Sequence, residues 1–176
     1  MARQMTFYVE GNETIAYLAA RAARKQGMRQ VRSVEDANVV LTYYPDEPDL
    51  EDAYFDSEGL VQLVGPQTFL VDLSPASPHF AHELFAVAAV SDLHFVAAPI
   101  AVLDQVAEDV FAPENLLVLA GGDARDVEAI RPLLEAIGEV RVFAEAGQAQ
   151  MARAAHTIGQ TARLISAIQW TPWVVT

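Results

Sequence analysis

The sequence contains no cysteine, and its 176 residues include a single lysine, Lys25. The absence of cysteine excludes disulfides, thiolate nucleophiles and cysteine-ligated metal sites. No apolar run reaches the roughly 20 residues of a membrane span, and the first residues, with Arg3 and Gln4, lack the apolar core of a secretory signal peptide. These absences predict a cytoplasmic protein without a membrane partner, and its length fits one α/β domain.

Positive charge is also scarce, with 11 Lys and Arg against 24 Asp and Glu and a formal net charge of −13. Nucleic acids bind basic surfaces, so this charge excludes a nucleic-acid partner. Five basic residues cluster near the end of the first predicted helix, where they complement the helix dipole or form an anion site: Arg21, Arg24, Lys25, Arg29 and Arg32. The acidic stretch 46–58 lacks the alternating spacing of a metal loop and is interpreted as a solvated helix start.

The beginning of the chain has the pattern of a dinucleotide-binding βαβ unit. An apolar strand at 7–9 breaks at Gly11, and an alanine-rich helix then runs to Gly27. In a Gly-x-Gly-x-x-Gly turn the second glycine lets the backbone approach a pyrophosphate. Here the three glycine positions hold Gly11, Glu13 and Ala16. Glu13 places a carboxylate at the helix N-terminus, where a phosphate would bind.

Alternating strand and helix patterns continue along the chain. Apolar runs of strand length are predicted at 38–44, 67–72, 94–98, 116–120 and 140–143, with helices after Pro45, from about Ser74 to Val90, from Asp123 to Gly138, and from Gly147 to about Ile168. This order predicts a Rossmann-like three-layer αβα sandwich with a mainly parallel sheet, followed by a long C-terminal helix. We expect the sandwich to occupy residues 1–146 and the helix and tail residues 147–176.

Only about ten residues separate Gly27 from the strand at 38–44. A dinucleotide-binding half has its second strand here, ending in an acidic residue for the ribose or an arginine for a 2′-phosphate. The sequence therefore predicts that this strand and the following helix are reduced to a stub, with a single helical turn at 33–36. At the other end of the chain, Trp170 and Trp173 either pack back on the domain or cover a partner, and the long preceding helix favours a homodimer through 147–176.

Five segments carry a resemblance to a known family: Gly11 to Gly27, Val39 to Asp46 with Tyr44 before Pro45, Asp72 to Pro78, Phe95 to Pro99, and Gly121-Gly122-Asp123 with Pro132 to Gly138. In this order the sequence resembles the N-terminal NAD(P)-binding domain of the 6-phosphogluconate and 3-hydroxyisobutyrate dehydrogenases, the β-hydroxyacid dehydrogenase family, which includes imine reductases. The resemblance covers nearly the whole chain. It implies NAD or NADP as the cofactor of an active member, and a C-terminal helical domain that has no counterpart in this sequence.

The positions that carry the family's chemistry depart from its pattern. The substrate loop Ser-Gly-Gly reads Ala101-Val102-Leu103. The catalytic lysine falls on Met151, and the substrate-binding asparagines fall on alanines. A thioether cannot relay a proton, so no catalytic residue is predicted. The resemblance leaves six low-specificity cofactor-contact positions: Gly11, Asn12, Glu13, Tyr44, Pro45 and Ser74.

A few polar residues remain as candidates for a different role. Ser74 either contacts a ligand at the carboxyl edge of the sheet or is the N-cap of the next helix. His79 and His82 share a helix face without a third metal ligand nearby, His94 is interpreted as structural, and His156 is a candidate replacement acid or base. No metal site is predicted.

Two functions are consistent with these residues. The first is a degenerate dehydrogenase-like Rossmann protein, without dehydrogenase activity or cofactor, which acts as a dimeric binding or scaffold domain and could bind a small molecule at the carboxyl edge of its sheet. The second is an NAD(P)-dependent oxidoreductase acting on a small hydroxy acid or imine. The residues favour the first, although fold alone does not fix function.

Overall fold

The computed structural model of the protein describes residues 5–11 and 13–169. Its strands are β1 (Thr6–Gly11), β2 (Arg29–Gln30), β3 (Val39–Tyr43), β4 (Phe69–Asp72), β5 (His94–Ala97), β6 (Ile100–Val102), β7 (Leu116–Gly122) and β8 (Glu139–Phe143). Its α-helices are α1 (Glu13–Lys25), α2 (Glu47–Phe55), α3 (Leu60–Leu63), α4 (Pro78–Val90), α5 (Ala124–Glu135) and α6 (Ala146–Gln169), with 3₁₀ turns η1 (Val34–Asp36) and η2 (Pro113–Asn115). The predicted strand and helix order is confirmed, with a shift of a few residues at most boundaries.

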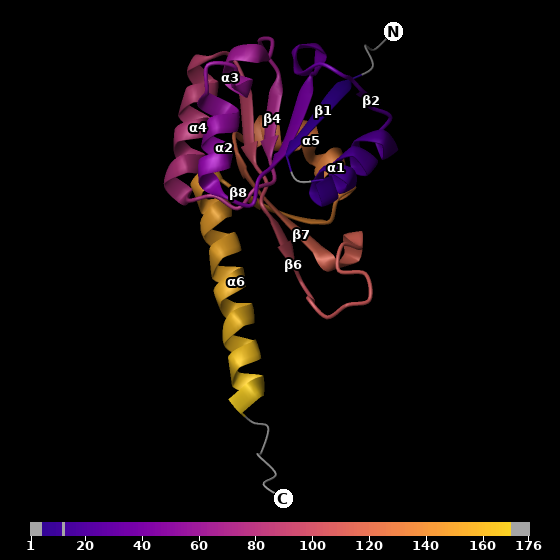
Figure 1. The fold of residues 1–176 in the computed structure, drawn as a ribbon, viewed down its shortest axis with the longest axis vertical. Coiled ribbons are helices and arrows are strands. Elements are labelled where there is room, and N and C mark those ends of the chain that lie inside the picture. Colours follow the sequence, from indigo (N-terminus) through magenta and orange to yellow (C-terminus); the bar gives the residue numbers. More distant parts are fainter. Residues whose placement is uncertain (1–4, 12, 170–176) are drawn as a thin grey trace, which may run out of the picture.

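The strands form one eight-stranded sheet in the order β2-β1-β3-β4-β5-β7-β6, with β8 paired to β7 (Figure 1). The first five strands in this order pair parallel with one another, as predicted. β7 is antiparallel to both β5 and β6, which the sequence did not predict. No crossover helix separates β5 from β7, so the returning strand pairs in the opposite direction. β8 then follows α5 and is parallel to β7.

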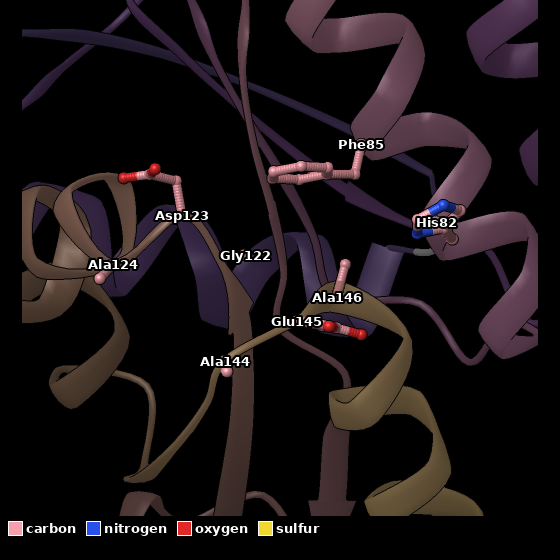
Figure 2. A pocket seen from close by; sticks show the side chains of 8 residues that line it. All are labelled: His82, Phe85, Gly122, Asp123, Ala124, Ala144, Glu145 and Ala146. Atoms are coloured by element: carbon pink, nitrogen blue, oxygen red, sulfur yellow. The ribbon is translucent and has the colours of Figure 1, made fainter.

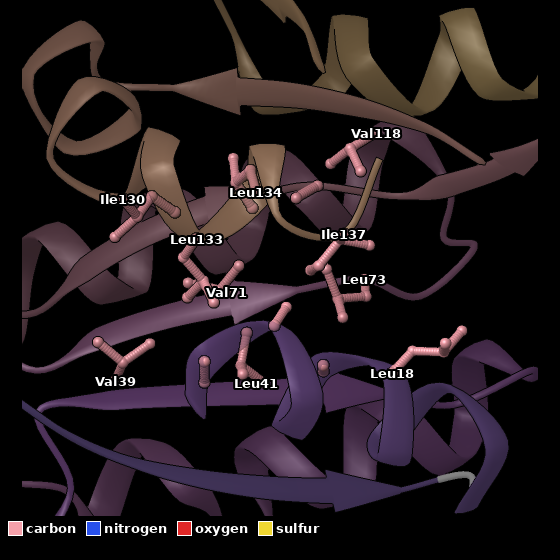
Figure 3. Packing of buried hydrophobic residues seen from close by; sticks show 14 of the residues in the cluster. Leu18, Val39, Leu41, Val71, Leu73, Val118, Ile130, Leu133, Leu134 and Ile137 are labelled. Carbon is pink, nitrogen blue, oxygen red and sulfur yellow. The ribbon is translucent and has the colours of Figure 1, made fainter. Parts of the chain in front are cut away.

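Helices cover both faces of the sheet and produce the three predicted layers. Alternate residues of β3 point to opposite faces: Val39 and Leu41 join a cluster with α1 and α5, and Val40 joins a second cluster with α2, α3, α4 and the start of α6. Figure 3 shows Val39, Leu41 and Val71 facing side chains of α1 and α5. A sheet buried on both faces explains why its strands read as continuous apolar runs.

The region between α1 and β3 is short, as predicted. β2 contains two exposed residues, and η1 is a single turn in place of a full helix. The turn is attached to β1, because Thr6 Oγ1 donates to the carbonyl of Asp36 at 2.8 Å and Asn38 N donates to Thr6 Oγ1 at 3.1 Å. These bonds allow the shortened segment to reach β3 directly.

The helix starts correct one interpretation. Ser77, rather than Ser74, is the N-cap of α4, because its side chain accepts a hydrogen bond from Phe80 N at 3.1 Å. Asp123 is the N-cap of α5 and accepts from Arg125 N, as predicted.

α6 begins one residue before the predicted start and extends away from the sheet (Figure 1). The division of the chain at residue 146 stays a prediction. Trp170 and Trp173 lie outside the described residues.

Candidate functional site

The carboxyl ends of β1, β3 and β4 bring several of the predicted positions together. Gly11 ends β1 and pairs with Tyr43, and Tyr44 N donates to Ser74 Oγ at 2.9 Å. Pro45 follows and is exposed. Asn12 lies outside the described residues, as does the side chain of Glu13, whose backbone opens α1. The three parallel strands therefore place the described candidates at one edge of the sheet, where open α/β sheets bind ligands.

Gly11 is required by the packing of this edge. Its φ is +105°, a conformation that L-residues with side chains rarely adopt, and a Cβ at this position would be 1.9 Å from the carbonyl oxygen of Tyr43. Gly11 occupies the first of the three glycine positions, which makes the tight turn, and its packing against Tyr43 requires a glycine there. This contact explains the glycine without a cofactor.

Ser74 is fully buried at the same edge. Its hydroxyl oxygen accepts from Tyr44 N, and its own N–H donates to Asp72 Oδ1 at 3.0 Å. Ser74 therefore joins the ends of β3 and β4. The sequence suggested a ligand contact or a helix cap, and the structure places the side chain in this link between strands.

Asp72 is the principal buried polar residue that sequence reasoning missed. It is 1% exposed, and its Oδ1 accepts a hydrogen bond from Thr42 Oγ1 at 3.1 Å. Because the Thr42 hydroxyl proton is used in this bond, Thr42 Oγ1 accepts from the buried Tyr54 hydroxyl at 2.9 Å. Among the described residues Asp72 Oδ2 has no hydrogen-bond partner. Burial raises the pKa of Asp72 from 3.8 to about 6, although hydrogen bonds from Ser74 and Thr42 oppose the shift. The sequence signal that could have identified Asp72 is an acidic residue at the end of an apolar strand.

Glu10 gives this edge a negative charge. The Tyr44 hydroxyl donates to Glu10 Oε1 at 3.0 Å, and burial, followed by the Glu10 charge, raises the pKa of Tyr44 well above its usual range. The segments 6–13, 42–47 and 72–77 contain no lysine or arginine. These segments therefore offer an anionic ligand no positively charged side chain.

The first turns of α6 attach the helix to this edge. Gln150 is buried; its Oε1 accepts from Ala76 N at 3.1 Å, and its Nε2 donates to the carbonyl of Ser74 at 3.0 Å. Met151, at the family's lysine position, is 61% exposed. The two alanines at the asparagine positions, Ala154 and Ala155, are also exposed.

His156, the candidate replacement acid or base, forms a hydrogen bond with the backbone. His156 Nε2 lies 3.1 Å from the carbonyl oxygen of Val102, to which it can only donate. His156 follows Met151 by five residues, which places it roughly 140° around the helix from that position. The expected substrate loop is partly a strand, since Ala101 of β6 pairs with Leu117. A hydrogen-bonded strand here replaces the flexible glycine-rich backbone that the family pattern has.

The remaining histidines form no metal centre. His79 and His82 are exposed on α4, whereas His94 Nδ1 lies 2.8 Å from Asp126 Oδ1 and the His94 ring stacks on Phe69. The structural interpretation of His94 is confirmed. Over residues 5–11 and 13–169, no group of three metal-ligating side chains comes together.

A pocket of about 340 Å³ lies where β7 and β8 end, beside α4. Figure 2 shows His82 and Phe85 of α4 on one side and the starts of α5 and α6, with Asp123 and Glu145, around the rest. No sequence pattern predicted this pocket, because its walls come from segments far apart in the chain. Asp123 already caps α5.

The fold and the carboxyl edge of the sheet define a Rossmann-type αβα domain. A model of the NAD binding domain of 6-phosphogluconate dehydrogenase matches residues 4–158. The chain therefore belongs to the 6-phosphogluconate dehydrogenase family, in its NAD-binding domain, as the motifs predicted.

Relatives of this family are oxidoreductases. NAD-dependent L-serine dehydrogenase of Pseudomonas aeruginosa is 32% identical over 130 residues, covering 74% of this chain and 40% of that protein. An uncharacterized oxidoreductase of Synechocystis sp. is 30% identical over 133 residues, covering 73% of this chain and 44% of that protein. The chain spans less than half the length of these relatives.

Solved structures share the fold. 3-Hydroxyisobutyrate dehydrogenase of Mycobacterium tuberculosis with L-serine has a TM-score of 0.77 at 20% identity, covering 93% of this chain and 62% of that one. An imine reductase of Myxococcus stipitatus in complex with NADP+ has a TM-score of 0.72 at 17% identity, covering 95% of this chain and 64% of that one.

None of the helices in the described part of our chain has both the length and the apolar character that crossing a membrane requires.

Proposed function

We propose that this chain is a 6-phosphogluconate dehydrogenase-family domain that does not perform dehydrogenase chemistry and acts as a dimeric binding or scaffold domain, with residues 147–176 forming the dimer contact. The observation that carries this proposal is Met151, which stands exposed at the lysine position on α6. A general acid or base must reach the reacting proton with an ionisable group, and a thioether has none. His156, the nearest histidine on the helix, lies on a different side of it and binds a backbone carbonyl.

The carboxyl edge of the sheet supports the same proposal. Most of its described polar groups are hydrogen-bond acceptors that already accept from neighbouring residues. Ser74 Oγ accepts from Tyr44 N, and Glu10 Oε1 accepts from the Tyr44 hydroxyl. A small neutral or cationic molecule is therefore a better ligand for this edge than a dinucleotide.

The second candidate is an NAD(P)-dependent oxidoreductase that acts on a small hydroxy acid or imine and uses NAD or NADP. The observation that favours it is the match of residues 4–158 to the NAD-binding domain model, together with the position of Gly11, Tyr44 and Ser74 at one edge. Under this alternative the cofactor binds at the carboxyl edge of the sheet without the contacts of the usual glycine-rich turn.

Titration with NADH and NADPH distinguishes the two. Cofactor fluorescence and the thermal unfolding midpoint are followed in the same samples, with the P. aeruginosa relative as the positive control. A ligand that binds only the folded state stabilises it by roughly 2.7 kcal/mol at a hundredfold excess over Kd. We expect no saturable response. Saturable fluorescence with a rising midpoint would refute the proposal and favour the oxidoreductase.

A further inference from the structure

Five basic residues near the end of α1 have no role in the function proposed above. We name them the basic face: Arg21, Arg24, Lys25, Arg29 and Arg32. No aspartate or glutamate occurs between residues 13 and 35. The face contributes +5 to a chain whose formal net charge is −13, so the remaining residues carry −18. Arg21 lies three and four residues before Arg24 and Lys25, and like charges at this spacing destabilise a helix. A binding role explains why they stay together.

The basic face is not paired with the chain's own carboxylates. Arg21 is half-buried, and the other four residues are exposed. Within the described part of the chain no ion pair includes any of the five, whereas Arg131 and Arg141 each pair with a neighbouring glutamate. Arg24 Nη2 donates to the neutral side chain of Gln30. The positive charge of the face is therefore available to a partner.

α1 and β2 present the basic face at one end of the sheet. At about 100° per residue, Tyr17, Arg21 and Arg24 fall within an arc of roughly 60°, on the side of α1 away from its buried residues. β2 is the edge strand and contacts α1; Arg29 lies in it and Arg32 shortly after it (Figure 1). Tyr17 is 64% exposed, so an aromatic side chain belongs to the same surface.

A pocket of about 410 Å³ lies beside the first half of α1 and adjoins the basic face at Arg21. It is lined by Thr14, Tyr17, Leu18 and Arg21 of α1 and by Asp109 and Phe111 of the segment between β6 and β7. Asp109 Oδ1 accepts from Phe111 N at 3.1 Å, so this carboxylate is engaged within its own loop. The pocket therefore combines two aromatic residues with a cation.

We propose that the basic face and this pocket dock an acidic segment of a partner protein that carries one bulky apolar residue. The carboxylates of the segment pair with Arg21, Arg24 and Arg29, and its apolar side chain enters the pocket beside Tyr17 and Phe111. Arginine and tyrosine often supply much of the binding energy of protein interfaces, and a guanidinium can bind a carboxylate through two hydrogen bonds. The inference goes beyond the proposed function, because the surface includes neither the carboxyl-edge candidates nor residues 147–176.

The charge of the rest of the chain favours a short protein segment over other anions. A nucleic acid carries a charge at every nucleotide, so it would extend from the face onto a body of −18 that repels it. A protein segment can confine its carboxylates to the face. A small anion would gain little, because a single exposed ion pair contributes little to binding. Several pairs together with a buried apolar side chain overcome this weakness.

Biolayer interferometry with the whole chain and an immobilised peptide tests the docking. The probe is a peptide of about ten residues, half of them glutamate, with one central phenylalanine. We expect saturable binding that weakens as salt is added and a Kd that rises at least roughly fivefold in Arg24→Glu. Arg125→Glu is the matched control, because it makes the same charge change at an exposed arginine of α5, and its Kd should stay within about twofold of the wild type.

Thermal unfolding midpoints check that both variants are folded. The absence of saturable binding up to about 1 mM peptide, or the same Kd in Arg24→Glu and Arg125→Glu, would overturn the proposal.

The pocket is tested with a second peptide in which serine replaces the phenylalanine. Phe111→Ala should raise the Kd of the phenylalanine peptide at least roughly fivefold and leave that of the serine peptide unchanged. Val90→Ala removes an apolar side chain that is 87% exposed on α4, and it should affect neither peptide. Equal effects of Phe111→Ala on the two peptides would show that the pocket does not hold the apolar residue.

Other anionic partners are tested by competition. A thymidine oligonucleotide of equal charge and vesicles of anionic lipid should displace the peptide only weakly. Displacement by either at a similar concentration would make the face a general anion surface and overturn the proposal.

These results are separable from the proposed absence of dehydrogenase chemistry. A protein that binds neither the peptide nor NADPH would overturn the docking surface and leave that absence standing. A protein that binds both, with the peptide still sensitive to Arg24→Glu, would support the surface and overturn the absence.

Discussion

Replacing Asp72 by asparagine is expected to change how the stability of the fold depends on pH. Asp72 is 1% exposed, and burial holds its pKa at about 6 in the folded chain, against 3.8 for the unfolded group. The folded state therefore binds the proton more tightly than the unfolded state. This contribution to stability is fully present below pH 3.8 and is lost as the pH rises through 6.

The magnitude follows from the same two pKa values. The difference between 3.8 and about 6 corresponds to at most about 3 kcal/mol. The sequence pI is about 4.5, so measurements at pH 5 and above avoid the region of low solubility. Between pH 7.5 and pH 5 the wild-type chain should gain about 1 kcal/mol from Asp72 alone.

The Asp72→Asn variant removes this titration and keeps the shape of the side chain. Its amide oxygen can still accept from Thr42 and Ser74, whereas its NH₂ group has no acceptor at the Oδ2 position and costs about 1–3 kcal/mol at every pH. Urea unfolding followed by circular dichroism at half-unit steps of pH gives both free energies. We expect the free energy of unfolding of the wild type, minus that of the variant, to increase by about 1 kcal/mol as the pH falls from 7.5 to 5. Parallel curves would show that Asp72 does not titrate in this range and would refute the account of its burial.

Two further substitutions test the packing of the sheet edge. Gly11→Ala should destabilise the fold by about 3 kcal/mol or more in urea unfolding, because its Cβ would meet Tyr43 O at 1.9 Å, whereas Gly65→Ala, with nothing within 4 Å, should be nearly neutral. Equal stabilities of the two variants would contradict this packing. Gln150→Ala should cost about 2–3 kcal/mol through the loss of its two buried hydrogen bonds, and the exposed control Gln148→Ala less than about 0.5 kcal/mol. A neutral Gln150→Ala would mean that the start of α6 is held by apolar contacts alone.

The main strands could be read from the sequence because each is an apolar run ended by glycine, proline or an acidic residue. β2 could not, since both of its residues are polar and exposed, and two residues have no periodicity. The antiparallel direction of β7 was also not predictable, because an apolar run is the same in either direction. Direction depends on the connection, and the segment between β6 and β7 carries no helix pattern long enough for a crossover.

At the site, the rule that ligands bind at the carboxyl ends of parallel strands correctly brought Gly11, Tyr44 and Ser74 together. The roles of the side chains were not predictable, because they depend on partners about 30 residues away. Ser74 and Ser77 each precede a proline, and either could cap a helix by local sequence. Their hydrogen bonds distinguish them. Ser74 Oγ accepts from Tyr44 N in the neighbouring strand segment, whereas Ser77 Oγ accepts from Phe80 N and caps the helix.

α6 is attached to the body of the domain at its start, through Gln150. Its 24 residues span about 36 Å, and its first turns are fixed to the loop after β4, next to the carboxyl edge of the sheet. α6 is also bonded near its middle, where His156 and Gln160 contact the carbonyl of Val102. The helix therefore connects the loop after β4 to β6, two segments that lie apart in the strand order of the sheet.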